Sequence, residues 1–543
     1  LAVQPGHREP LTSVTTAQEA SQRTSRVLGM LTEYLTPADA PWYPGPEAFT
    51  QAVVAEAGVQ FERAFDRWRS LYRSALEQHA QAGRVITDAT STREQMKQAQ
   101  QDQAMATALL AALRDATEGS SGDFNLYRYL ATEGFLPGYN FPRLPVLACI
   151  PGNRDKEQAY VQRPRFLALS EFGPRALLYH EGRTYRVVKV RLGGRQEGIS
   201  ERTGDLPVLE VRVCKRCGAG HLARHENGCH ACGEPLGDSR LIKGLYRIEH
   251  VDTRPTQRIT ADDEDRQRQG FELVTTFRWP VREGRPAVQT VVAADGDGDI
   301  LTLQYGSSAT ITRINLGLRR RKNRNEFGYD INPKTGWWGK GLDEDQDDGS
   351  APPTAPTSQR IVPFVEDQKN ALHLRFADAD GLDDSTRATL QHALRRAIEV
   401  VYQLEEGELL VEPLPDRDLR SGLLFYEAAE GGAGVLTRLA HEPEAIARVA
   451  YEALRVLHLE LPEWSAEARG ALPANAAALS DAERPCVKSC YRCLLSYYNQ
   501  PDHEVVDRRD ESARRILLRL SRIDTVLAEP PAQQGSTNQL AQE

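Results

Sequence analysis

Long apolar runs are absent from this 543-residue sequence, which has no stretch of roughly 18 consecutive apolar residues that could span a bilayer. The N-terminus also lacks the apolar run of a signal peptide and the basic helix of a targeting sequence. An overall positive charge is missing too, since the net charge at pH 7 is -9. These absences exclude a membrane-spanning helix and a uniformly basic nucleic-acid binder, so nucleic-acid binding would depend on local basic patches.

A nucleotide-hydrolysing motif is absent as well. A P-loop requires the pattern G-x-x-x-x-G-K-[ST], whose backbone amides hold the phosphates. The nearest string, GWWGKGL at 336–342, lacks this glycine spacing and has no Ser or Thr after Lys340. The acidic string DEDQDDG at 343–349 belongs to a Pro-rich stretch and not to the end of a strand. We therefore predict no catalytic residues in this chain, and ATP and Mg²⁺ would bind only to a motor outside it.

Cysteines outside tight clusters are rare. Seven of the eight cysteines fall into two groups and only Cys149 stands apart. This distribution is typical of metal ligands in a reducing compartment and not of a disulfide framework, so we predict a cytoplasmic protein. The sequence begins at Leu1 instead of Met, and we expect it to be part of a longer polypeptide.

The chain exceeds the roughly 250 to 300 residues at which a single hydrophobic core stops growing, so several domains are expected. Aromatic residues recur at helical spacing at Phe61, Phe65, Trp68 and Tyr72. This spacing predicts a helical N-terminal region whose aromatic stripe is buried.

Period-two alternation at 176–190, 207–213 and 271–279 predicts a β-rich middle domain. The acidic, Pro-rich stretch at 342–359 predicts a linker, and an amphipathic helix is expected at 385–404. The predicted fold is α+β and multidomain, with a helical region at 1–120, a β-rich domain at 121–341 containing a zinc ribbon at 210–236, a linker at 342–359, an α+β zinc-binding domain at 360–529 and a disordered tail at 530–543.

The strongest metal signal is two C-x-x-C pairs separated by eleven residues, formed by Cys214, Cys217, Cys229 and Cys232. Each pair can present two thiolates to one tetrahedral Zn²⁺, and Gly218 and Gly233 would supply the tight turns that follow. Four thiolates close the coordination sphere, so the predicted zinc is structural. The neighbouring histidines, expected at the surface or beside the ligands, are His221, His225 and His230.

A second group of cysteines comprises Cys486, Cys490 and Cys493. Three thiolates leave one tetrahedral position open. His503 is the predicted fourth ligand, with Asp502 as the weaker alternative, because imidazole suits a zinc thiolate site better than carboxylate does.

Basic residues concentrate in LRRRKNRN at 318–325, followed by the aromatic residues Phe327, Tyr329, Trp337 and Trp338. Cations beside aromatic rings are typical of single-strand binders, although a solvated loop next to the acidic linker explains the run equally well. The candidate DNA contacts are Arg319, Arg320, Arg321, Lys322 and Arg324, with Arg216 and Arg224 of the first cysteine cluster as a second set.

Two other patterns have competing interpretations. ADGDGD at 294–299 favours a hairpin turn over a Ca²⁺ site, because a strand-like run follows it. EGGAGVL at 430–436 favours the packed start of a helix over a phosphate site. Glu427 lies beside it, but no His or second carboxylate at a suitable spacing indicates acid/base catalysis.

Around the second cluster the sequence resembles the MrfA-type zinc-binding domain of large superfamily 2 helicases. The matching features are FYEAAEGGAGVL at 425–436, CVKSCYRCLLSYYNQ at 486–500 and the Asp507–Arg508 pair. The segments 127–145, 163–182 and 259–273 resemble the region between motor and C-terminal domain in helicases of bacterial anti-phage systems, especially the Druantia type. Members of the zinc-binding family use four cysteines in this cluster, whereas this chain has three.

The resemblance implies the C-terminal part of an ATP-dependent DNA helicase in anti-phage defence or DNA repair. Such a region would guide single-stranded or unwinding duplex DNA and organise a motor located elsewhere. An alternative is a separate zinc-binding subunit that partners a helicase in trans, as in DISARM-type defence. A stand-alone zinc hydrolase is disfavoured, because the first site is closed and the second shows no general base beside an open position.

Overall fold

The computed structural model describes most of the chain from residue 58 onward. Among the described residues, no helix is long and apolar enough to cross a membrane. The described ranges are 58–88, 145–151, 159–192, 206–222, 227–258, 270–282, 285–333, 336–339, 358–378, 381–428, 434–483 and 485–528, with isolated positions between 48 and 135.

The chain divides into two compact units, each built from three segments. The first comprises Leu1–Val208, Tyr246–Gly270 and Lys322–Pro363, and the second Leu209–Leu245, Phe271–Arg321 and Phe364–Glu543. The sequence predicts separate domains on either side of the acidic stretch, whereas strands from both sides pair in one sheet of the second unit. Apart from residues 358 and 359, the predicted linker lies outside the described residues, as does the predicted tail.

A five-stranded sheet organises the first unit. Its central strand β8 pairs in parallel with β1 and antiparallel with β4. Across the sheet the order is β2 (Ala159–Arg163), β1 (Val146–Ile150), β8 (His250–Arg258), β4 (Arg183–Arg191) and β3 (Leu177–His180), and helix α6 (Arg165–Glu171) connects β2 to β3.

Helix α3 (Asp66–Thr87) also belongs to the first unit. The side chains of Phe65, Trp68 and Tyr72 are buried in one apolar cluster, with Phe61 packed against it. The hydroxyl of Tyr129 donates to the carbonyl of Ala64 at 2.6 Å, which ties the same cluster together. The predicted burial of the aromatic stripe is confirmed, because its helical spacing places all four rings on one face.

The GWWGKGL string has a structural role where it is described. Gly336 adopts φ +78°, and its carbonyl accepts a hydrogen bond of 2.9 Å from the amide of Val190. A Cβ at this position would lie 2.1 Å from the carbonyl oxygen of Val190. Glycine is therefore required for close backbone approach and not for phosphate binding.

An eleven-stranded sheet organises the second unit, although β7 and β15 run across the division between units. Two long strands, β13 (Gly298–Leu318) and β15 (Gln359–Phe376), pair antiparallel over most of their length. The sheet order is β18 (Val526–Leu527), β12 (Gln289–Asp295), β13, β15, β7 (Arg240–Arg247), β5 (Leu209–Val213) and β6 (Gly220–His221), with β9 (Phe271–Arg278) on β13, β14 (Tyr329–Ile331) and β17 (Gly422–Glu427) on β15, and β16 (Leu409–Leu414) on β17. Separately, β10 (Val281–Arg282) pairs with β11 (Arg285–Pro286).

The Asp-Gly string is a hairpin turn, as predicted. Asp295 at the end of β12 pairs with Gly298 at the start of β13. The Asp295 carboxylate forms an ion pair with Arg519, at 2.7 and 2.8 Å from the two guanidinium nitrogens. The turn therefore anchors a helix, and the hydrogen bond from Arg519 holds the pKa of Asp295 below its usual value.

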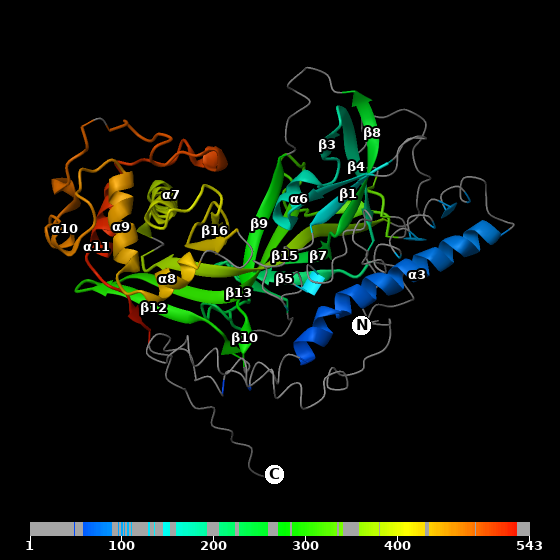
Figure 1. The fold of residues 1–543 in the computed structure, drawn as a ribbon, viewed down its shortest axis with the longest axis horizontal. Helices are drawn as coiled ribbons and strands as arrows, with labels where there is room; N and C mark the ends of the chain where they lie inside the picture. The colour runs from blue at the N-terminus through cyan, green and yellow to red at the C-terminus, as the bar shows by residue number, and fades with distance from the viewer. Residues whose placement is uncertain are drawn as a thin grey trace, which may run out of the picture. The chain divides into compact units, whose positions relative to one another are not determined.

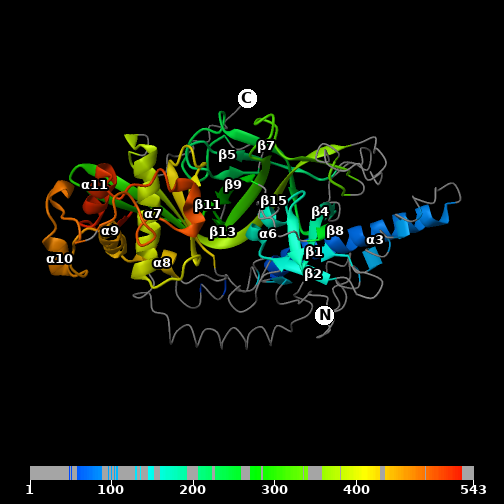
Figure 2. The ribbon, with the colours of Figure 1, turned by 90° about the horizontal axis from the view of Figure 1, so that it is seen from above.

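Three helices of the second unit, α7 (Asp384–Val401), α9 (Ala445–Val456) and α11 (Glu511–Leu520), pack on one another in both views (Figures 1 and 2). Asp383 caps α7 by accepting from the amide of Thr386 at 2.7 Å, and Asp510 caps α11 in the same way through Ala513. Their apolar faces share a core with the sheet that includes Leu301, Leu303, Leu390, Leu394, Leu454 and Leu517. The shorter helices are α8 (Val435–His441), α10 (Ala466–Gly470) and the 3₁₀ helices η5 (Ala476–Ala478) and η6 (Tyr497–Asp502).

Candidate metal centres

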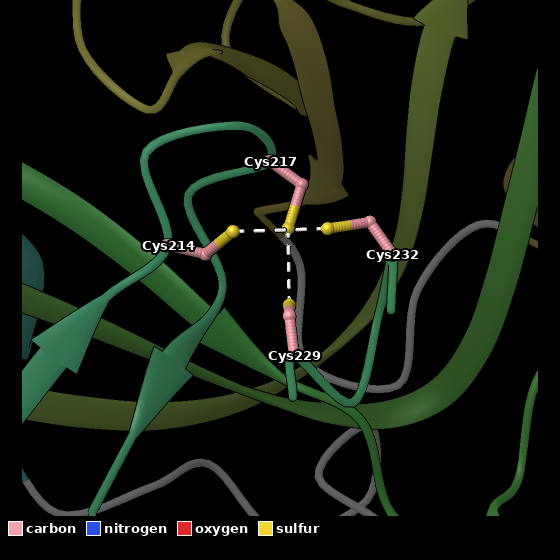
Figure 3. A group of neighbouring side chains, drawn as sticks. All are labelled: Cys214, Cys217, Cys229 and Cys232. Atoms are coloured by element: carbon pink, nitrogen blue, oxygen red, sulfur yellow. Dashed lines mark hydrogen bonds between the residues drawn. The ribbon is translucent and has the colours of Figure 1, made fainter. Parts of the chain in front are cut away.

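The four cysteines of the first cluster converge as the sequence predicts (Figure 3). Cys214 and Cys217 follow β5, and Cys229 and Cys232 lie between β6 and β7. The sulfur atoms of Cys214 and Cys232 are 3.7 Å apart, and those of Cys217 and Cys229 are 3.5 Å apart. A zinc tetrahedron with Zn–S bonds of about 2.3 Å has sulfur–sulfur edges of about 3.8 Å, so these donors fit a closed Zn²⁺ site.

Two equivalent turns shape this ribbon. In each turn a glycine amide donates to the carbonyl of the first cysteine, Gly218 to Cys214 at 2.9 Å and Gly233 to Cys229 at 2.8 Å. The φ angles of the two glycines are +73° and +75°, a left-handed conformation that disfavours other residues. The predicted tight turns are therefore present after both cysteine pairs.

The crowded thiols of this cluster do not titrate alike. Hydrogen bonds with the other three cysteines hold the pKa of Cys214 far below the usual thiol value. Hydrogen bonds within the same group, together with burial, raise the pKa of Cys217 far above that value. The four thiols therefore cannot all be ionised at once without a metal, so some of them stay protonated. A bound dication would displace those remaining protons.

The ribbon packs against the loop between β16 and β17. The hydroxyl of Ser421 donates to the carbonyl of Arg216 at 2.6 Å, and a Cβ on Gly218 would lie 2.9 Å from the Leu414 side chain. The adjacent Arg420 forms a buried ion pair with Asp502, at 2.6 Å between Nη2 and Oδ1. One short loop therefore contacts the first cluster and also the helix η6 that follows the second.

The second cluster has four potential donors and not three. The sulfur of Cys493 lies 3.7 Å from that of Cys486 and 3.5 Å from that of Cys490. The Nε2 atom of His458 lies 3.3 Å from the sulfur of Cys490 and completes the group. With Zn–N bonds of about 2.0 Å and Zn–S bonds of about 2.3 Å, a tetrahedral nitrogen–sulfur edge is about 3.5 Å, so a Cys₃His zinc site fits these positions.

His458 occupies an unusual backbone position. It follows helix α9 with φ +60°, its amide donates to the carbonyl of Arg455, and the amide of Leu459 donates to that of Leu454. This pair of bonds is a Schellman motif, in which the left-handed residue is usually glycine. An imidazole at such a position is unfavourable for the backbone alone, which is consistent with a functional requirement for its side chain.

The local environment favours a thiolate at Cys490. Burial acts to raise the pKa of this thiol, but hydrogen bonds from His458, from the backbone of Arg492 and within the cluster lower it to about 6. Burial raises the pKa of Cys493 to about 12. The cluster therefore holds one readily formed thiolate that could begin metal binding, with the remaining protons released as the metal binds.

The structure does not place His503 at this cluster, in contrast to the sequence prediction. The Nε2 atom of His503 lies 3.0 Å from both the carbonyl of Ser496 and the amide oxygen of Asn499. The weaker alternative, Asp502, is buried between Arg420 and His392. His503 lies downstream of the cysteines in the sequence, whereas the fourth donor, His458, follows the end of α9 and lies 28 residues before Cys486.

The basic run at 318–325 is partly engaged in structure. The guanidinium of Arg321 donates to Glu272 at 2.5 Å, and its side chain is only 12% exposed. Arg319 donates to the carbonyl of Phe271 at 3.2 Å and is otherwise exposed, as are Arg320, Lys322 and Arg324. The run therefore combines one anchored arginine with four solvent-facing cations.

The aromatic residues near this run are mostly not available for stacking. Tyr329 and Trp338 are buried and pack edge to face, with ring centroids 5.8 Å apart. The guanidinium of Arg254 lies 5.0 Å from the ring centroid of Trp337. Hence the aromatic half of the predicted single-strand site is used largely within the first unit.

The second set of basic candidates is only half described. Arg216 is exposed and forms an ion pair of 2.8 Å with Glu234, while Arg224 lies outside the described residues, as does His225. His221 is buried, and its Nδ1 atom lies 3.3 Å from that of His230. These two histidines therefore pack beside the ribbon and are not among its four donors.

A carboxylate of the same chain occupies the N-terminal end of α8, which follows the glycine-rich string. The carboxylate of Glu427 accepts from the amides of Val435 and Leu436 at 2.9 and 3.4 Å, and from Asn370 at 3.1 Å. Glu427 is buried, and the carboxylate satisfies amides that begin α8. The predicted packed helix start is confirmed over the described residues, since the amides that a phosphate would use are occupied.

Comparison with known proteins supports the assignment of the second cluster as a zinc site. Residues 390–494 match the family model of the MrfA Zn-binding domain. A comparison with curated protein sequences finds no match. Three solved structures of the DUF1998 helicase MrfA show low similarity to this chain. The structure bound to DNA has 11% sequence identity and a TM-score of 0.32 over 80% of this chain. The structure of the helicase alone has 9% identity and a TM-score of 0.24 over 65% of the chain, and the one bound to DNA and AMPPNP has 10% identity and a TM-score of 0.21 over 63%.

The chain spans 39%, 36% and 30% of the lengths of those three structures, and TM-scores this low do not establish a shared overall fold. The matched segment contains His458 and all three cysteines of the second cluster, whereas the first cluster lies outside it. The chain therefore carries an MrfA-like zinc-binding domain, as its sequence resemblance predicted.

Proposed function

We propose that this chain is the accessory C-terminal region of an ATP-dependent DNA helicase, acting in anti-phage defence or DNA repair without containing the ATPase motor. In this role it guides DNA, single-stranded or unwinding, and serves as a scaffold for motor domains in cis or in trans. The observation that carries the proposal is the match of residues 390–494 to the MrfA Zn-binding domain, within which four donors converge.

Both metal centres have the character of structural sites. Each offers four donors within 4.8 Å of one another, so a bound Zn²⁺ would have no position left for a catalytic water. Zinc would instead hold the ribbon and the 486–503 segment in fixed conformations, because metal binding energy becomes folding energy in small modules. ATP and Mg²⁺ would bind only to the motor.

The donor chemistry also supports a cytoplasmic location. Seven cysteines form two ligand groups, and thiolate ligands persist where the compartment is reducing.

The proposal is tested with the purified, zinc-loaded chain. We expect binding to labelled DNA in an anisotropy assay and no ATP hydrolysis, with or without DNA. ATP turnover by the chain alone would contradict the proposal. So would a chain that at low salt binds neither single-stranded nor duplex DNA.

A further inference from the structure

An exposed aromatic surface lies on the segment that follows the second cluster. Among the described residues four tyrosines are exposed, and three of them, Tyr491, Tyr497 and Tyr498, fall within eight consecutive residues. Their exposed fractions are 66%, 61% and 65%. A group of exposed aromatic rings usually marks a binding surface, because large apolar side chains are more stable when they are buried than when they face water.

The backbone that carries these rings is held firmly. Ser496 and Asn499 form a reciprocal capping box at the start of η6, and the Asn499 amide also donates to the carbonyl of Leu494 at 2.7 Å. Leu494 and Asn499 are buried, and Cys490 and Cys493 belong to the donor cluster. The rings therefore project from a prearranged support, which lowers the entropy lost on binding.

His503 connects the two parts of this surface. Its ring packs edge to face against Tyr491, with centroids 5.8 Å apart, while its Nε2 contacts the carbonyl of Ser496, the residue before Tyr497. Tyr497 and Tyr498 pack edge to face on each other at 5.8 Å. His503 is thus a positioning residue that fixes Tyr491 relative to η6.

Cations border the rings. Lys488 and Arg492 are exposed on the same cysteine segment, and Lys488 donates to the carbonyl of Glu504. Arg492 also lines an open hollow of about 470 Å³ whose wall includes Arg396 and Arg455 as well as Glu452 and Glu460. Arg455 and Arg396 are already paired with Glu452 and Glu399, at 2.8 and 3.3 Å, so Arg492 is the cation of this lining that can contact an anionic backbone next to Tyr491.

We infer that Tyr491, Tyr497 and Tyr498 form a single-stranded DNA site, in which unpaired bases stack on the rings and phosphates contact Arg492 and Lys488. The inference rests on the proposed function and adds the place and mode of DNA contact. Flat rings accept any base, whereas bases within a duplex have no free faces to stack. The site therefore selects single strands without reading sequence.

The test replaces all three tyrosines with Ala, with Leu or with Phe in the full zinc-loaded chain. Binding is measured by anisotropy with a labelled oligodeoxythymidine of about 20 nucleotides and with a duplex of equal length. Because loss of one stacked ring weakens binding by roughly fivefold or more, we expect at least about 100-fold weaker single-strand binding for the Ala and Leu variants, in which three rings are lost. The Phe variant should bind nearly as the parent does, and duplex binding should change little.

The matched control is Tyr179→Ala, which removes an exposed tyrosine of the first unit and should leave affinity unchanged. His503→Ala should weaken single-strand binding without lowering zinc content. Photo-cross-linking of the parent chain to an iodouracil-containing strand should label one of the three tyrosines, which tests the site even where a variant folds poorly.

Four results would overturn the inference. Unchanged single-strand affinity in the Ala variant, or cross-links only elsewhere, would leave the proposed function standing and place the DNA contact at another surface. Full binding by the Leu variant would show that apolar contact suffices, as for a protein partner. Absence of any DNA binding by the parent chain would overturn both the inference and the proposed function.

Discussion

Arg508 forms a bidentate ion pair with Asp481 through two parallel hydrogen bonds, each of 2.9 Å, from its two terminal nitrogens to the two carboxylate oxygens. The same guanidinium donates to the carbonyl of Cys486 at 2.5 Å and to that of Leu457 at 3.3 Å. One side chain therefore links the first cysteine of the second cluster to the residue before His458. The Asp507–Arg508 pair of the sequence resemblance thus has an arginine that organises the metal centre.

We predict that Arg508→Lys lowers the free energy of unfolding by about 2 kcal/mol, because an ammonium cannot reproduce the planar fork that joins three acceptors. The same change should speed zinc release to a chelator. Arg509→Lys is the matched control, since Arg509 is exposed and pairs only locally with Asp507, at 3.1 Å. Equal melting temperatures for the two variants would show that the fork does not stabilise the cluster.

The fourth ligand can be assigned by zinc content. We expect about two zinc ions per chain for the parent and about one for His458→Ala, because three thiolates alone leave the second site incomplete. His458→Cys should restore about two, since a fourth thiolate suits the same geometry. His503→Ala should retain about two, and loss of zinc in this variant but not in His458→Ala would return the assignment to His503.

The first cluster should be essential to its ribbon. Cys217→Ser is expected to lower zinc content to about one ion per chain and to destabilise the second unit, because the metal site supplies folding energy. Cys149→Ser provides the comparison, since Cys149 is buried in the first unit outside both donor groups. A melting profile that is unchanged in Cys217→Ser would mean that the ribbon folds without metal.

The exposed members of the basic run give a separate DNA prediction. Replacing Arg320 and Lys322 with Ala should weaken single-strand binding and reduce the slope of log affinity against log salt by up to about 1.4, since each phosphate contact contributes about 0.7. Arg321→Ala should instead affect stability, because its guanidinium holds Glu272. Identical salt slopes for the parent and the double variant would identify the run as a solvated face. Lys243→Ala is the control, because it removes a single exposed cation outside the run.

Acid should destabilise the second unit through His373. Burial, and then the charge of Arg375, lower the pKa of His373 to about 3. Its unfolded pKa is about 6.5, so stability is fully present above that pH and falls by about 3 kcal/mol as the pH drops to about 4. His373→Gln should flatten the melting temperature between these pH values, whereas the exposed His441→Gln should not, and equal slopes for both variants would contradict this origin.

The sequence alone determined the features that depend on local pattern. The two C-x-x-C pairs placed four thiolates at one site, because fixed spacing and two left-handed glycines leave little freedom in how each turn folds. Helical spacing likewise predicted the buried stripe from Phe61 to Tyr72 and the face of α7 that includes Leu390 and Leu394. These features repeat with the periods of their own elements.

Tertiary structure decided the features that join distant segments. His458 reaches Cys490 only because α9 ends beside the cysteine segment, and no local motif marks a ligand so far from the cluster. The same packing assigns His503 to the tyrosine-bearing helix instead of the metal centre. A donor contributed by a helix end depends on how helices pack, which the spacing of residues along one segment cannot specify.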